Sequence, residues 1–233
     1  MRLIARLTCI LVALAAVLEV IFPPLATTAE NALFVNMTQH LILMAVAAPL
    51  MVMSGALASL ESLSVTFELT RPRNALLIFL ATFLLWHWPG ITELGERTRL
   101  IGLVEGLSLF AAAWLFWTSA LSDRHHMMSN RARFIYVLFA AAASDFIVLW
   151  LTYGCALFGK LIHNSAFRIP IKMECPDFFA LMMWMPANLV FVAIAISLGT
   201  RTATNAELDI IEYVPPDFEA AQRLTSRTLP KAA

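Results

Sequence analysis

Apolar residues form long continuous runs along this chain, and short polar segments separate them. The runs cover residues 3–24, 32–57, 75–90, 101–121, 134–158 and 177–200. A helix that crosses a bilayer needs about 20 mostly apolar residues. The runs approach or exceed that length and lack the alternation of a barrel strand. The pattern therefore predicts an all-α fold, a polytopic transmembrane helical bundle of about six spans.

Composition agrees with a membrane protein. Hydrophobic residues make up 60% of the chain and charged residues 14%, whereas soluble domains have about 25% charged residues. The net charge is zero, and like charges form no long run. These features exclude disordered, collagen-like and nucleic-acid-binding proteins. Membrane lipid is the first partner that the sequence predicts.

The Lys and Arg residues predict the orientation, since positive charge concentrates on the cytoplasmic side. With a cytoplasmic amino terminus, eleven of the sixteen basic residues lie inside, which places both termini in the cytoplasm. This is the orientation of a multi-pass protein of the bacterial inner membrane. The inside residues are Arg2, Arg6, Arg71, Arg73, Arg124, Arg131, Arg133, Arg201, Arg223, Arg227 and Lys231.

Two domains follow from this topology. Residues 1–200 form the six-span transmembrane domain, and residues 201–233 form a polar cytoplasmic tail around Pro215 and Pro216. The first segment has a basic start and small residues after Pro24, as a cleaved signal peptide would. We expect an uncleaved first span, with a cleaved leader as the alternative.

Polar side chains in these spans gather toward the outer side. An ionisable group in hydrocarbon costs about 2.5–3.5 kcal/mol, so each needs a reason to be there. His40 lies near the outer end of the second span, His87 ends the third, and Glu105 lies about a turn inside the fourth. Cys155 ends the fifth span and Asp177 begins the sixth.

A stripe of soft ligands follows the second span. At about 100° per residue, Met37, His40, Met44 and Met51 fall within one narrow arc of a helix. Thioether sulfur and imidazole together suit Cu(I). The alternative is that the methionines fill gaps between helices and that His40 bonds to a neighbour.

Glu105 lies between Gly102 and Gly106, a spacing that lets another helix approach closely. A carboxyl group buried against that helix needs a partner, which His40 or His87 would supply. His87 stands between two tryptophans, where a solvated interfacial histidine is the alternative. Asp145, near the middle of the fifth span, is expected to bond to a neighbouring helix, with an ion or proton-relay role as the alternative.

Cys155 and Cys175 bracket the outer segment between the last two spans. In an oxidising compartment they would form a disulfide, and metal-ligand or redox roles are the alternatives. Asp177, Trp184 and Asn188 are expected on one face of the sixth span, which Pro186 would kink.

Several segments resemble one family. Residues Asn36–Leu50 are similar to the signature of the multi-spanning CtaG family of cytochrome c oxidase assembly factors, which opens with His-x-x-Gln-His and runs into Ala-Pro-Leu. Trp86–Pro89, Leu115–Trp117 and Asp177–Pro186 resemble its Trp-His-x-Pro, Leu-Phe-Trp and Asp-x-x-x-Gly-x-Met-Trp-x-Pro motifs. The resemblance covers roughly residues 30 to 200, in the family's order and at similar spacing.

The resemblance implies that His40 and His87, and with them Asp177, are copper ligands at the outer face. The chain departs from the family pattern at Asn36, Ile101 and Glu105, where the family has histidines, and at Leu181, where it has glycine. The full set of candidate metal ligands is His40, His87, Asp177, Glu105, Met37, Met44, Cys155 and Cys175.

Two functions follow from the motifs and their departures. The first is an assembly factor that holds Cu(I) transiently for an oxidase subunit. The second is a non-catalytic accessory subunit of a larger respiratory complex that has lost the metal site. Haem held between His40 and His87 is a third, geometrical alternative. We expect no enzyme, because the sequence has no Gly-rich phosphate loop, Gly-x-Ser-x-Gly or His-Glu-x-x-His.

Overall fold

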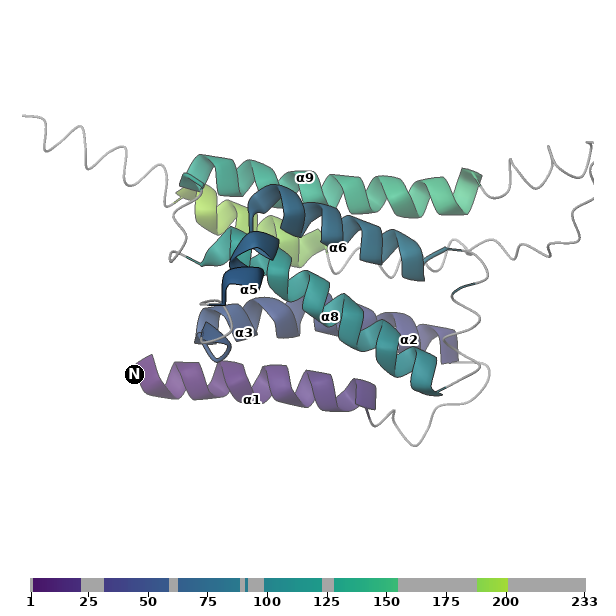
Figure 1. Ribbon diagram of the computed structural model, residues 1–233, viewed down its shortest axis with the longest axis horizontal. Coiled ribbons are helices and arrows are strands. Elements are labelled where there is room, and N and C mark those ends of the chain that lie inside the picture. Colours follow the sequence, from purple (N-terminus) through teal and green to yellow (C-terminus); the bar gives the residue numbers. More distant parts are fainter. Residues whose placement is uncertain are drawn as a thin grey trace, which may run out of the picture.

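The fold is all-helical throughout the part of the chain that the structure describes. A computed structural model describes residues 2–21, 32–58, 63–88, 91, 99–122, 128–154 and 188–200. The long helices lie side by side and alternate in direction, as Figure 1 shows. This confirms the all-α part of the predicted fold class.

Each hydrophobic run holds helical residues. The elements are α1 (Arg2–Ile21), α2 (Ala32–Leu41), the π-helical η1 (Ile42–Ala47), α3 (Ala48–Ser54), α5 (Ser64–Leu69), α6 (Pro72–Trp86), α8 (Arg99–Leu121), α9 (Asn130–Leu149), the π-helical η2 (Trp150–Gly154) and the helix Asn188–Thr200. Val35–Ser54, Leu100–Leu121 and Asn130–Leu149 are long and apolar enough to cross a membrane. The apolar helices Arg6–Ala15, Pro72–Trp86 and Asn188–Thr200 are shorter. Six crossings and cytoplasmic termini stay predictions.

Local sequence fixes where two of the helices begin. Pro72 stands in the first turn of α6, where its missing N–H costs nothing. Ser129 caps α9, because its side chain accepts a hydrogen bond from the backbone N–H of Ala132 at 3.3 Å. Both helices therefore begin three or four residues before the apolar runs that predict them.

Pro49 explains the π-helical turn inside the second hydrophobic segment. α2, η1 and α3 follow one another without a break, and the backbone N–H of Ala48 bonds to the carbonyl of Leu43, five residues back. In the same pattern the carbonyl of Met44 would pair with residue 49, but proline has no N–H. The indole Nε1 of Trp117 donates to that carbonyl at 2.8 Å instead.

α8 is the central helix of the bundle and contacts α1, α2, η1, α3, α6 and α9. Aromatic rings fill the core beside it. Phe79 stacks on Phe116 at 4.9 Å between ring centroids, and Trp117 lies 4.9 Å from Phe191 of the helix Asn188–Thr200. These contacts hold α6 and the last described helix against α8.

One end of the bundle carries α3's carboxyl end, and we call it the Gly55 end; it lies at the left of Figure 1 with the amino terminus. Gly55 ends α3 with a positive φ of 65°, and Arg6 of α1 donates to its carbonyl at 3.3 Å. Arg133 of α9 donates to the carbonyl of Ser122, just after α8, at 3.2 Å. Both arginines therefore bind carbonyls at helix carboxyl ends, where the backbone dipole favours positive charge.

Candidate functional site

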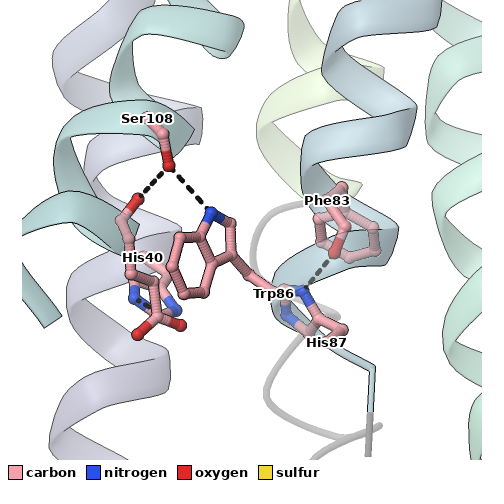
Figure 2. Close-up of polar contacts among 6 residues, drawn as sticks. His40, Phe83, Trp86, His87 and Ser108 are labelled. Atoms are coloured by element: carbon pink, nitrogen blue, oxygen red, sulfur yellow. Dashed lines mark hydrogen bonds and ion pairs between the residues drawn. The ribbon is translucent and has the colours of Figure 1, made fainter. Parts of the chain in front are cut away.

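Three elements bring polar side chains together at the opposite end, which we call the His40 end. His40 comes from the last turn of α2, Glu105 from the second turn of α8, and His87 is the residue that ends α6. Figure 2 shows the His40 and His87 imidazoles, with the Trp86 indole reaching from α6 toward Ser108. The three elements are far apart in sequence, and α8 joins the other two.

His40 and Glu105 form a buried pair. The Nε2 atom of His40 lies 3.5 Å from Oε1 of Glu105, and their side chains are only 4% and 2% exposed. This is longer than an N–H···O hydrogen bond of about 2.9–3.0 Å, but a carboxylate attracts the N–H dipole of a neutral imidazole more strongly where water is excluded. The expectation that buried Glu105 needs a histidine partner is confirmed, and the partner is His40.

The two imidazoles are close enough to share a ligand. Their ring centroids are 6.4 Å apart and their planes meet at 64°. A metal bound at about 2.0–2.1 Å from one nitrogen of each ring, with the nitrogens on opposite sides of it, would separate the centroids by about 6 Å. The spacing therefore fits a metal held between the two rings.

The backbone and one aromatic ring hold His87 in place. Its Nδ1 atom lies 2.8 Å from the carbonyl oxygen of Phe83, and the Phe83 ring stacks on the imidazole at 4.1 Å between centroids. A carbonyl oxygen only accepts hydrogen bonds, so the proton is on Nδ1. The lone pair of neutral His87 is then on Nε2.

Trp86 and Ser108 tie α6 to α8 beside the histidines. The Trp86 indole donates to Ser108 Oγ at 2.8 Å, and Ser108 Oγ donates to the backbone carbonyl of Glu105 at 2.9 Å. Trp86 is 9% exposed, whereas Trp88 is 52% exposed. Ser108 was not among the predicted site residues; its signal in the sequence is a polar residue three positions after Glu105 on an apolar helix.

The soft-ligand stripe divides at the π-helical turn. Met37 is half-buried one turn before His40, while Met44 is buried in the main core. Met51 instead packs with Ala13, Leu43 and Ala47, toward α1. The single arc was predicted from α-helical periodicity, and η1 changes the number of residues per turn between His40 and Met51.

The structure also tests the predictions for the glycine motif around Glu105 and for Asp145. Gly106 is buried inside the bundle, as Glu105 is, so at least this part of the close-packing motif faces the chain's own helices. Asp145 accepts a hydrogen bond from Nδ2 of Asn188 at 2.6 Å, which confirms the expected tie to a neighbouring helix.

Three candidate ligands, Cys155, Cys175 and Asp177, lie outside the described residues, as do Trp184, Pro186 and the tail 201–233. Within the described ranges, no group of three or more His, Cys, Asp and Glu side chains has the arrangement of a metal site. The described part of the candidate site is therefore the pair His40 and His87, with Glu105 beside it.

Comparison with known proteins adds the family. No curated protein and no solved structure matches the chain. The family model of the cytochrome c oxidase caa3 assembly factor matches residues 3–204. That range holds the described helices almost entirely, together with the motifs that predicted the family from the sequence. The chain belongs to the cytochrome c oxidase caa3 assembly factor family.

Proposed function

We propose that this protein supports maturation of a copper centre of cytochrome c oxidase by holding Cu(I) transiently between His40 and His87. The observation that carries the proposal is the approach of the two imidazoles to 6.4 Å between ring centroids, from two elements that α8 joins. Family membership supports the oxidase as the client. The orientation predicted from basic residues places the site at the outer face of the membrane.

The donor atoms suit Cu(I). Imidazole nitrogen binds copper well, and Met37, one turn before His40 in the sequence, would offer a thioether. The Nδ1 atom of His40 is buried and has no hydrogen-bond partner among the described residues. A buried polar atom of this kind normally has a partner, so a ligand at Nδ1 would complete it.

Few ligands also suit transient binding. Asn36 and Glu105 stand where the family has histidines, so the described site offers two imidazoles rather than a closed cage. Cu(I) accepts low coordination numbers, whereas structural Zn²⁺ sites take four ligands. A two-imidazole site would let an oxidase subunit with more ligands take the ion.

The proposal is tested in cells that carry the oxidase and lack this protein. Wild-type protein is expected to restore the copper content of the purified oxidase and its activity, and His87→Ala is not. Leu85→Ala is the matched control, because it truncates a side chain that is 50% exposed on the same helix. Full restoration by His87→Ala would contradict copper handling and favour an accessory role without metal.

A further inference from the structure

The neighbours of the two imidazoles indicate which nitrogen of each neutral ring carries the proton. Nδ1 of His87 donates to a backbone carbonyl, so its Nε2 keeps the lone pair. In His40 the arrangement is reversed: Nε2 faces the Glu105 carboxylate at 3.5 Å, and Nδ1 has no hydrogen-bond partner among the described residues.

We propose that Glu105 is a positioning residue, whose carboxylate keeps the proton on Nε2 of His40 and presents Nδ1 as the atom that binds the metal. A metal at this site would then be bound by Nδ1 of His40 and Nε2 of His87. The part that concerns metal rests on the proposed function. The part that concerns the proton does not, because it is a property of the protein alone.

Electrostatics supports this assignment. A carboxylate attracts the N–H dipole and repels a lone pair, and it does so strongly at 2% side-chain exposure. In metal sites, a histidine ligand commonly gives its second N–H to a carboxylate, which fixes the tautomer and the ring orientation. The 3.5 Å separation between Nε2 and Oε1 is longer than an ordinary hydrogen bond of this kind.

Direct ligation by Glu105 is the competing role. Carboxylate oxygen is a hard ligand that suits Mg²⁺ or Ca²⁺, whereas Cu(I) favours sulfur and imidazole. With the carboxylate next to Nε2 and the second histidine on the metal, Cu(I) needs no oxygen ligand. Glu105 therefore acts through His40, which explains how the chain functions with a carboxylate where the family has histidine.

The proton assignment is tested without metal. The protein, labelled with ¹⁵N in its five histidines, is placed in detergent micelles and its imidazole tautomers are read from long-range ¹H–¹⁵N correlations. His40→Gln and His87→Gln spectra assign the two rings. We expect the Nε2–H tautomer for His40 and the Nδ1–H tautomer for His87. An Nδ1–H tautomer for His40 would overturn the proposal.

Glu105→Gln tests the positioning role. It keeps the size of the side chain, removes the charge and adds an amide that can donate to Nε2. We expect His40 to move toward the Nδ1–H tautomer and Cu(I) affinity to fall by about 10–100-fold. Glu105→Asp, which keeps the charge, is expected to retain the wild-type tautomer and part of the affinity. Glu68→Gln is the control, since that carboxylate is exposed and paired with Arg71.

The outcomes separate this proposal from the proposed function. An unchanged tautomer and unchanged affinity in Glu105→Gln would show that the carboxylate does not position His40. An oxygen ligand from Glu105 in the X-ray absorption spectrum of the Cu(I)-loaded protein would show that it is a ligand. If wild-type protein binds no Cu(I) while the predicted tautomers are observed, the copper function fails and the proton assignment stands.

Discussion

Glu105 and Asp145 are both carboxylic acids on apolar helices, yet their surroundings differ. Asp145 of α9 is half-buried and accepts a 2.6 Å hydrogen bond from Asn188 of the last described helix. Glu105 of α8 is 1% exposed and faces an imidazole at 3.5 Å, with a second imidazole beyond it. The neutral side-chain amide of Asn188 is the hydrogen-bond donor to Asp145. Glu105 instead lies beside the two imidazoles between which we propose that a metal binds.

Burial and hydrogen-bond distance distinguish the pair of Asp145 and Asn188 from the pair of Glu105 and His40. Interhelical hydrogen bonds in membranes contribute about 0.6 kcal/mol on average, and Asp145 with Asn188 is such a tie. The pair of His40 and Glu105 is more deeply buried and less closely bonded. Such a pair recovers little of the free energy that burying its polar groups costs, so a role beyond stability is the simpler explanation.

Removing the partner of each acid gives the largest difference. His40→Leu is expected to lower the free energy of unfolding by about 3 kcal/mol, because the buried Glu105 carboxylate loses its imidazole neighbour. Asn188→Leu is expected to cost about 1 kcal/mol, since Asp145 is only half-buried. Detergent unfolding followed by circular dichroism measures both, and equal or reversed costs would remove the distinction between the two sites.

Trp117→Phe removes the hydrogen bond from the indole to the carbonyl of Met44. We expect it to lower the free energy of unfolding by about 1–2 kcal/mol, because the buried carbonyl is left without this donor. In a Pro49→Ala background residue 49 has an N–H again, so the same substitution is expected to cost less. A double-mutant cycle on unfolding free energies gives the coupling, which should be about 1 kcal/mol. Additive costs would mean that Trp117 does not compensate for the proline.

Ser108 and Ser144 form a matched pair near the two acids. Ser108→Ala removes the acceptor of the Trp86 indole, so it should cost about 1 kcal/mol and weaken Cu(I) binding several-fold through His87. Ser144 donates to the carbonyl of Ala140 on its own helix, and Ser144→Ala should change stability by less than about 0.5 kcal/mol. Similar Cu(I) affinities in the two variants would rule out the positioning role of Ser108.

The smallest effect belongs to the exposed ion pair of Glu68 and Arg71. Their side chains are 55% and 53% exposed at a separation of 2.8 Å. Glu68→Gln should change the free energy of unfolding by less than about 0.5 kcal/mol, because water screens exposed charges. A loss as large as that of His40→Leu would show that charge, rather than burial, decides the ranking.

The fold class, the family and the approach of the two histidine-bearing segments were predictable, because each depends on hydrophobic length or on short motifs. A histidine partner for Glu105 was also predicted, because a buried acid needs one, but the sequence left His40 and His87 as equal candidates. The π-helical turn was not, because an α-helical period was assumed across Pro49. The hydrogen bond of Trp86 was not predicted either, because its acceptor Ser108 lies on another helix.

Cu(I) binding by the purified protein tests the central claim most directly. Under reducing conditions, detergent-solubilised protein competes with a chromogenic Cu(I) chelator, beside His40→Asn, His87→Ala and the Leu85→Ala control. We predict one Cu(I) per chain in the wild type and the control, and no competition above background in either histidine variant. Absence of competition by the wild type, or equal competition by all four proteins, would contradict a copper site between His40 and His87.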